Sequence, residues 1–347
     1  MLRRVVEISR DPCSLVTRDE QLLILRRDDG PPKALPANPH NLAGSIPCED
    51  LGMLIVDERD TTYTHALLTK LAEHGTALVV CGRDHLPIGV YAPLPRNTDL
   101  LARLHAQIDM TKPCRKRLWS RIVAAKIRAQ ARNLAQNSQA RSKLLGIART
   151  VRSGDPDNRE AYAAMVYWPA LFSLAPGITQ PFRREAGDRT APPPNNLLDY
   201  GYSILRAAVA RALVGAGLLP ALGLRHIGRS NFFCLADDLV EPLRPLIDAR
   251  VLRMIGEGRF DLRQETKADL IKVLWTTVRT GNEAGPLQVA LTHYAASLVR
   301  CLEGDPGRLN IPVLYDPHAP AEPEADGAKP EEADDPDNPE EPKASDR

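Results

Sequence analysis

The sequence lacks several features that would assign it to common protein classes. Its six cysteines form no C-x-x-C pair, so we expect scattered reduced thiols in a cytoplasmic protein rather than disulfides or a zinc site. The uncharged apolar run at residues 212–224 has 13 residues and contains a proline, so it is too short and too broken to span a membrane. The N-terminal segment MLRRVVEISRDP has no apolar stretch, so we expect no signal peptide there.

Common catalytic motifs are also missing. The sequence contains no G-x-x-x-x-G-K-[ST] or G-x-G-x-x-G loop and no G-x-S-x-G motif. Nucleotide-hydrolysing folds, dinucleotide-binding folds and nucleophile-elbow hydrolases are therefore unsupported.

Charge is distributed unevenly along the chain. The net charge is +1, but residues 317–347 hold eleven Asp and Glu against three Lys and Arg. The remaining residues, 1–316, hold 42 basic and 33 acidic side chains, a net of +9. A basic body with an acidic tail favours a polyanionic partner, although a modestly basic surface can also serve only solubility.

The order of predicted elements indicates an α+β protein, and 347 residues are enough for two domains. We expect a small β-rich domain over 1–95, a linker over 96–112 and a larger all-α domain over 113–305. A C-terminal extension over 306–347 should be disordered from about residue 317, because it is acidic and rich in proline.

Short Val-, Ile- and Leu-rich runs bounded by turn residues predict the strands. They cover residues 3–9, 14–17, 21–27, 53–58, 77–82 and 89–94. Apolar residues at helical spacing predict the helices. They cover residues 65–75, 100–109, 115–147, a segment after Asp155-Pro156, 196–214, 236–256, 264–280 and 284–303. Proline-rich segments at 31–39 and 181–195 should be loops.

Glu160 heads an apolar helical face. In REAYAAMVYWPALF, positions 160, 163, 164, 167, 168 and 171 share one face, and every member except Glu160 is apolar or aromatic. We expect Asp155 to be the N-cap of this helix and Pro156 its first residue. The alternative is that Glu160 is placed only to favour the helix dipole.

A second acidic group lies in LADDLVEPLRPLID, where Asp237 and Asp238 are four and three residues before Glu241. Both pairs can share a helical face. Pro242 and Pro245 remove two backbone donors, so we expect an irregular helix there. His226 lies in the loop LGLRHIGRSN that precedes this helix.

Two carboxylates and an imidazole without a nearby cysteine suit Mg²⁺ or Mn²⁺, which act in phosphodiester chemistry. The alternatives are that Asp237 and Asp238 face solvent, paired with Arg244 or Arg250, and that His226 is an ordinary hydrogen-bonded histidine.

A basic helical face supports a nucleic-acid partner. Residues 111–154 contain no acidic residue, and a stripe of one sign can neutralise several phosphates. The alternative is a solvated helix surface. The candidate DNA-contacting residues are Arg117, Arg121, Lys126, Arg128, Arg132, Arg225 and Arg229.

Several separated segments resemble the spacer-acquisition integrase of CRISPR systems, most similarly its type II version. They are GDPDNREAYAAMVYW, NNLLDYGYSILRAAVARAL and GLRHIGRSNFFCLADDLVEPLRPLID, with further similarity in SIPCEDLGMLIVDE, ALVVCGRDHLPIGVYAPL and LWSRIVAAKIRAQARNL. The resemblance covers about residues 1–303 and leaves out the acidic tail.

The resemblance implies a β-rich domain that dimerises and a helical domain in which Glu160, His226 and Glu241 bind the catalytic Mg²⁺ or Mn²⁺. Asp237 and Asp238 would support these ligands or replace one of them. It also implies insertion of prespacer DNA into a CRISPR repeat by attack of a 3′-hydroxyl on a phosphodiester. The implied partners are double-stranded DNA and a small ferredoxin-like adaptation protein in a heterohexamer, with type II effector proteins as further candidates.

Two other readings use the same residues. A stand-alone metal-dependent DNA nuclease shares the whole ligand set and differs only in failing to join DNA. A non-catalytic dimeric nucleic-acid-binding scaffold would use the acids structurally and would bind no metal.

Overall fold

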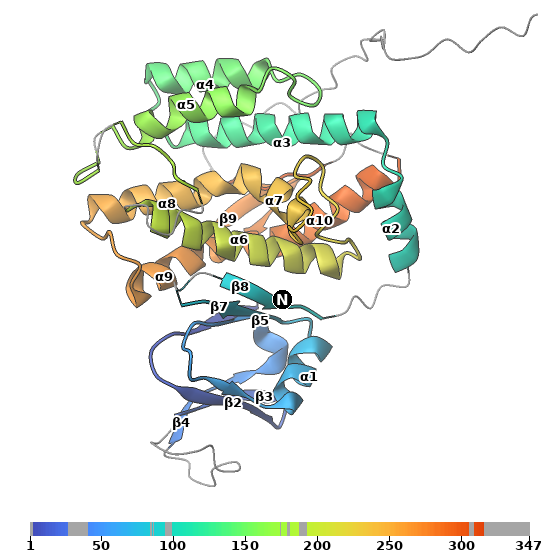
Figure 1. The fold of residues 1–347 in the computed structure, drawn as a ribbon, viewed down its shortest axis with the longest axis vertical. Coiled ribbons are helices and arrows are strands. Elements are labelled where there is room, and N and C mark those ends of the chain that lie inside the picture. The colour runs from blue at the N-terminus through green and yellow to red at the C-terminus, as the bar shows by residue number, and fades with distance from the viewer. Residues whose placement is uncertain are drawn as a thin grey trace, which may run out of the picture. The chain divides into compact units, whose positions relative to one another are not determined.

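The computed structural model describes residues 3–26, 41–83, 85, 87–93, 99–173, 175–178, 181–186, 193–304 and 309–315. The N-terminal part consists of strands and one helix (Figure 1). These are β1 (Arg4–Ile8), β2 (Cys13–Arg18), β3 (Gln21–Arg26), β4 (Leu42–Pro47), a 3₁₀ turn (Cys48–Asp50), β5 (Leu51–Val56), β6 (Thr62–Tyr63), α1 (His65–Glu73), β7 (Ala77–Cys81) and β8 (Pro87–Tyr91).

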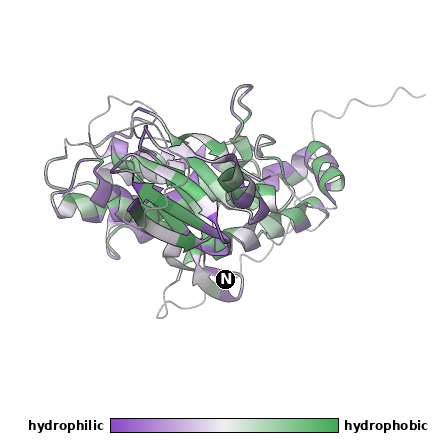
Figure 2. Ribbon diagram, turned by 90° about the horizontal axis from the view of Figure 1, so that it is seen from below, coloured by the Kyte–Doolittle hydropathy of each residue, from purple (hydrophilic) through white to green (hydrophobic). Residues whose placement is uncertain are grey.

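The strands form two sheets, ordered β1-β5-β7-β8 and β4-β3-β2-β6. In the first, β5 is parallel to β1 and β7, whereas β8 runs antiparallel to β7. In the second, β3 is antiparallel to β2 and β4. Figure 2 shows hydrophobic residues running along these strands.

Strand β5 is buried along its whole length, and its two faces pack in two different cores. Alternate residues point to opposite faces of a strand. Leu54 and Val56 therefore pack in a small core with α1, whereas Met53 and Ile55 join the larger helical core. The first 315 residues consequently form one compact unit, and residues 316–347, including the predicted disordered tail, lie outside the described residues.

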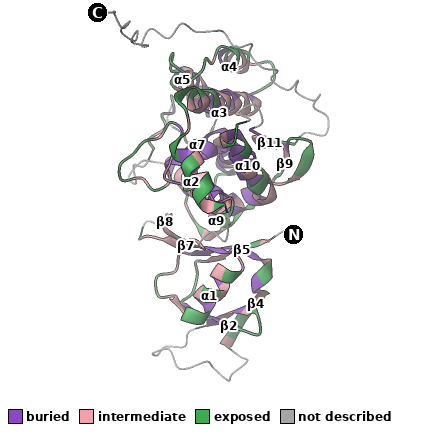
Figure 3. Ribbon diagram, turned by 90° about the vertical axis from the view of Figure 1, so that its right-hand side faces the viewer, coloured by how far each residue is buried: buried purple, intermediate pink, exposed green. Residues whose placement is uncertain are grey.

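The helical part begins at α2 (Figures 1 and 3). Its elements are α2 (Leu100–Ile108), α3 (Lys112–Arg132), α4 (Gln139–Arg149), α5 (Arg159–Leu171), α6 (Asn195–Gly215), α7 (Cys234–Val240), a 3₁₀ turn (Glu241–Leu243), α8 (Arg244–Gly256), α9 (Gln264–Ile271), a 3₁₀ turn (Lys272–Trp275), β9 (Thr277–Thr280), β10 (Glu283–Pro286), α10 (Leu287–Leu302) and β11 (Val313–Leu314).

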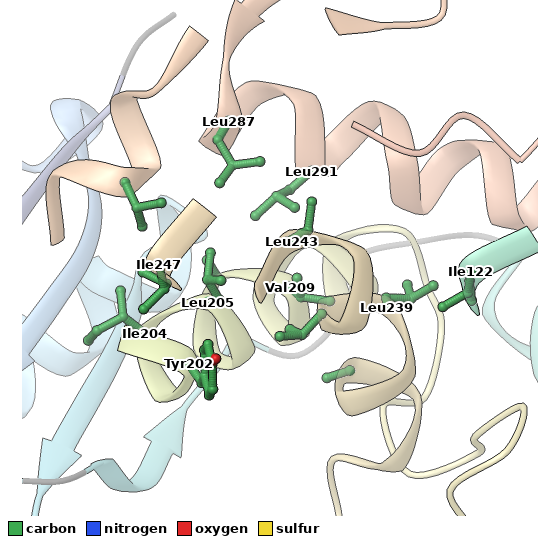
Figure 4. Packing of buried hydrophobic residues seen from close by; sticks show 14 of the residues in the cluster. Ile122, Tyr202, Ile204, Leu205, Val209, Leu239, Leu243, Ile247, Leu287 and Leu291 are labelled. Atoms are coloured by element: carbon green, nitrogen blue, oxygen red, sulfur yellow. The ribbon is translucent and has the colours of Figure 1, made fainter. Parts of the chain in front are cut away.

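Helix α6 lies inside the helical core. Its side chains Ile204, Leu205 and Val209 pack among Leu243 and Leu291 (Figure 4). Figure 3 shows the contrast between buried residues on β5 and β7 and exposed ones on α2. Among the described helices, none combines the length and apolar character needed to cross a bilayer.

Most predicted elements are confirmed, including the predicted strands, α1, α2 and α6. The irregularity expected at Glu241-Pro242 is present as the 3₁₀ turn between α7 and α8. Strands β4 and β6 were not predicted, because β4 (LAGSIP) is largely accessible and lacks an apolar run. The 31–39 loop lies outside the described residues.

Two helix predictions need correction at their boundaries. The single helix expected over 115–147 is two helices, because the chain leaves α3 after Arg132 and Ser138 caps α4 by accepting from the Arg141 amide at 3.2 Å. Helix α5 begins at Arg159 rather than at Pro156, because Asp155 and Asn158 both adopt positive φ angles that extend the turn.

The helices predicted over 264–280 and 284–303 are wrong in part. Residues 277–280 and 283–286 form an antiparallel hairpin around Gly281 and Asn282, and Gly281 has a φ of +60°. Strand β11 extends it to a sheet ordered β10-β9-β11. A Gly-Asn pair after a β-branched run is a hairpin signal, so the helical part is not purely α.

Candidate functional site

Glu160 is presented by the first turn of α5. The Asp155 carboxylate, in the preceding turn, accepts hydrogen bonds from the backbone amides of Arg159 at 2.8 Å and Glu160 at 3.1 Å. Asp155 therefore caps α5 without being its N-cap residue. Below Glu160, the predicted face is inside the core, with Ala163 and Tyr167 fully buried.

His226 is oriented by Asp238. The imidazole Nδ1 lies 2.7 Å from Asp238 Oδ1, and the same carboxylate accepts from the amides of Leu224, Arg225 and His226. Asp238 thus holds the whole loop segment against α7. Using Nδ1 for this contact leaves Nε2 as the ring nitrogen available to a ligand, which is the common arrangement of metal-binding histidines.

Glu241 lies where the helix is irregular, at the start of the 3₁₀ turn. Its side chain is only 5% exposed, and Arg244 Nη2 lies 3.0 Å from its Oε1. Pro242 and Pro245 prevent a regular helix through this segment. The turn directs Glu241 toward α3 rather than along the surface of α7 and α8.

The two glutamates meet at Lys126 of α3. The Lys126 ammonium lies 2.5 Å from Glu160 Oε1 and 2.5 Å from Glu241 Oε2. It donates a hydrogen bond to Glu160 and forms an ion pair with Glu241. The buried Oε2 of Glu241 is therefore neutralised by the Lys126 ammonium.

Burial and charge act against each other in this cluster. Burial favours the neutral form of Glu241, but Lys126 and Arg244 outweigh it and lower its pKa. Burial also opposes the charged form of Lys126, but Glu241 and Glu160 hold its pKa above the ordinary value. Glu241 and Lys126 are therefore both ionised near neutral pH, and each charge depends on the other.

His226 belongs to the same electrostatic environment. Its hydrogen bond to Asp238 raises its pKa, burial opposes this, and the charge of Glu241 adds to the increase. The Trp119 and His226 rings form a T-shaped pair, with centroids 6.1 Å apart. The imidazole thus lies between α3 and the acidic end of α7.

A buried polar network supports the Glu241 turn from behind. Asp248 accepts hydrogen bonds from Tyr167 at 2.9 Å and from Tyr202, and Asn133 donates to the Pro245 carbonyl at 2.8 Å. The Arg244 guanidinium lies over the Tyr202 ring. Side-chain hydrogen bonds therefore fix the proline-containing turn, where the prolines cannot donate the backbone hydrogen bonds of a regular helix.

Asp237 has a structural partner. It pairs with Arg206 Nε at 2.6 Å and accepts from Asn231 at 2.8 Å. These contacts tie the loop that carries His226 to α6 and α7. Asp237 and Asp238 are both buried, rather than solvent-facing and paired with Arg244 or Arg250.

The structure brings Glu160 and Glu241 together at the Lys126 ammonium, and the charge of Glu241 acts on His226. Across the described ranges, however, no three His, Cys, Asp or Glu side chains converge closely enough to form a ready metal site. The donor types fit a hard or borderline divalent ion. The Lys126 ammonium stands between the two carboxylates.

The predicted DNA-contacting residues differ in accessibility. Arg117, Arg225 and Arg229 are exposed, and Arg121, Arg128 and Arg132 are half-buried. Lys126, placed with them from the sequence, has a side chain only 12% exposed and points into the acidic cluster. Its position follows from helical spacing, since Trp119, Ile122 and Val123 on the same face of α3 are buried.

Comparisons with known proteins identify the family of this chain. Residues 8–274 match the family model described as CRISPR associated protein Cas1. The CRISPR-associated endonuclease Cas1 of Neisseria meningitidis serogroup C is 41% identical over 234 residues, which cover 66% of this chain and 74% of that protein.

Two solved structures share the fold. A casposase bound to integration product has a TM-score of 0.67 at 18% identity, covering 86% of this chain and 90% of that one. A Cas6-RT-Cas1–Cas2 complex has a TM-score of 0.68 at 18% identity, covering 89% of this chain and 36% of the other. The segment matched by the family model, residues 8–274, includes both glutamates, the histidine and their supporting aspartates. The chain belongs to the Cas1 family.

Proposed function

We propose that this protein is a metal-dependent DNA endonuclease and integrase of CRISPR adaptation, which inserts prespacer DNA into a CRISPR repeat. The observation that carries the proposal is that Glu160 and Glu241 both contact the Lys126 ammonium. Beside them lies His226, which Asp238 orients. The names of the relatives point the same way, since one is an endonuclease and another is a casposase bound to integration product.

Glu160, His226 and Glu241 would hold Mg²⁺ or Mn²⁺. The ion would polarise the scissile phosphate and stabilise negative charge on its oxygens. Asp238 keeps the His226 imidazole oriented through Nδ1, and Asp155 fixes the backbone of Glu160. Arg244 and Lys126 keep Glu241 ionised, so that it remains a ligand near neutral pH.

DNA would reach the site across basic surface. Arg225 and Arg229 are exposed on the loop that carries His226, and Arg117 is exposed near the start of α3. These side chains, with the half-buried Arg121, Arg128 and Arg132, would contact phosphates rather than read base sequence. Binding should then weaken steeply with salt.

The partners follow from the family. We propose that residues 1–95 form a dimerisation domain and that the homodimer assembles with a small ferredoxin-like partner into a heterohexamer. A solved complex in which a Cas1-containing chain is named together with Cas2 supports such an assembly. Type II effector proteins remain candidate helpers, and we expect the complex to act in the cytoplasm.

The test is strand transfer. Purified protein and its small partner are incubated in Mn²⁺ with a labelled 3′-hydroxyl duplex and a supercoiled plasmid that bears the repeat. Wild type should join the label to the repeat, whereas Glu160→Gln and Glu241→Gln should lose at least about a hundred-fold in rate, as expected when transition-state charge loses its stabilisation. Glu283→Gln, which alters a 73% exposed side chain, is the matched control.

Each alternative has its own outcome. Glu160-dependent nicking without joining would identify a stand-alone nuclease. A complete lack of Glu160-dependent reaction, together with no Mn²⁺-dependent thermal shift, would leave a DNA-binding scaffold in which the Lys126 cluster is only structural.

A further inference from the structure

A cavity of about 590 Å³ lies away from the acidic cluster, where the N-terminal part meets the ends of α6 and α10. Its described lining includes Arg3, Arg103, Arg211 and Arg300. These residues come from the segment before β1, from α2, from α6 and from α10, so only the folded chain brings them together. Neither glutamate of the acidic cluster nor His226 is among the lining residues.

Backbone carbonyls at helix ends hold three of these arginines. Arg3 donates to the His74 carbonyl, and Arg211 Nε donates to the next carbonyl, that of Gly75, at 2.9 Å. Gly75 follows the end of α1 with a φ of +68°, and both carbonyls lie beyond the helix. In the same way, Arg103 Nη1 donates to the Ala216 carbonyl beyond α6 at 2.7 Å.

These contacts use only a small part of the donor capacity. A guanidinium carries five N–H groups, and each of these three arginines gives one to a helix-end carbonyl. The Nε of Arg103 is buried without an acceptor among the described residues. Capping of helix ends therefore accounts for where the arginines lie, but not for the number of donors that meet in one cavity.

Positive charge in the cavity is incompletely balanced. In the ranges that the structure describes, no acidic side chain pairs with Arg3, Arg211 or Arg300, whereas Arg103 has Asp99 at 3.6 Å. The single acidic residue among the described lining is Glu303. Burial and the nearby charge of Arg3 lower the pKa of Arg211 to about 10. Charges of one sign that meet without matching acids are stabilised by an anion.

The lining indicates which anion. Between the arginines the wall includes small residues such as Ala212, Gly215 and Ala296, and the described lining has no Phe, Tyr or Trp on which a base could stack. Guanidinium groups bind phosphate oxygens through paired hydrogen bonds. The volume lies in the usual range for small-ligand sites, roughly 300–1,000 Å³.

We propose that this arginine cavity is a phosphate-binding site, separate from the metal-binding cluster. It binds the phosphate groups of a free phosphate compound or of a DNA strand that passes over the junction. This inference does not depend on the proposed catalytic chemistry.

Calorimetry with inorganic pyrophosphate tests the site, using the full-length protein in EDTA so that no metal site contributes. Wild type should bind pyrophosphate, and Arg300→Gln should bind at least ten-fold more weakly. Arg300 is exposed, so this variant keeps the fold even where Arg211→Gln does not. The charge-matched control is Arg18→Gln, whose side chain is 73% exposed on β2, and it should bind like wild type.

A Glu160→Gln variant separates this site from the acidic cluster and should bind pyrophosphate with unchanged affinity. Equal affinity of wild type and Arg300→Gln, or no binding to wild type, would overturn the proposal and leave the arginines as helix caps. Loss of strand transfer in Glu160→Gln bears only on the proposed function, so the two failures are distinguishable.

The salt dependence of DNA binding identifies the source of the phosphate. If a DNA strand occupies the cavity, Arg300→Gln should lower the slope of log affinity against log salt by about one. If DNA binding is unchanged while pyrophosphate binding falls, the ligand is a free phosphate compound. Either result supports the site.

Discussion

Replacing Lys126 with methionine should destabilise the metal-free protein. The change keeps an unbranched apolar stem of four atoms but removes the ammonium that lies 2.5 Å from both Glu160 and Glu241. Breaking a buried ion pair by removing one partner costs about 3–5 kcal/mol, because the other charge is left uncompensated. Glu241 keeps Arg244 at 3.0 Å, so we expect a loss near the lower limit, about 3 kcal/mol.

The loss should depend on pH. Lys126 lowers the pKa of Glu241 below its ordinary 4.5, so this carboxylate contributes stability above pH 4.5 that is lost as pH falls through its folded-state pKa. The pKa of Lys126 is raised above 10.5, so its contribution is complete below that pH. The difference between wild type and Lys126→Met should be largest at about pH 6–9 and should shrink below pH 4.5.

Urea unfolding in EDTA, followed by tryptophan fluorescence at pH 7 and pH 4, measures both effects. Lys112→Met, which alters an exposed residue of the same helix, is the control and should change the free energy of unfolding by less than about 0.5 kcal/mol. If Mn²⁺ binds between the two glutamates, it should stabilise Lys126→Met more than wild type, because the ammonium no longer competes. A loss below about 1 kcal/mol at pH 7, typical of an exposed pair, would refute the reasoning.

Three further substitutions test the loop and the junction. Asp238→Asn removes the carboxylate that raises the pKa of His226, so that pKa should fall, as measured by NMR titration of the imidazole; an unchanged value would contradict the contact. Gly223→Ala places a Cβ 2.3 Å from the His226 carbonyl oxygen, so strand transfer should fall sharply in the same assay while far-UV circular dichroism is unchanged. Burial raises the pKa of Glu7 from 4.5 to about 7, so wild-type stability should decline from pH 4.5 to 8, and Glu7→Gln should flatten that decline in urea titrations; parallel curves would argue against it.

Local patterns in the sequence predicted a large part of the fold. The helical face under Glu160, the length of α6 and the irregular turn at Glu241 follow from periodicity and proline chemistry, which depend on neighbours within one or two turns. The β9–β10 hairpin was missed, although Gly281-Asn282 is a turn signal, because the apolar spacing around it also fits a helix.

The role of Asp238 needed the fold. From the sequence, Asp238 was one of two acids that share a face with Glu241. In the structure it accepts from three consecutive amides and from His226, which makes it the group that orients the loop. A loop has no periodicity, so the sequence could not indicate which acid its amides would face.

The sequence by itself determined which residues would be placed for chemistry, because Glu160 and Glu241 interrupt apolar or proline-bound segments where packing alone would not favour an acid. Only the tertiary structure decided that Lys126 lies between them and that four arginines share one cavity. Periodicity assigns a side chain to a face of its own element, whereas the partner across that face is set by how helices distant in sequence pack together.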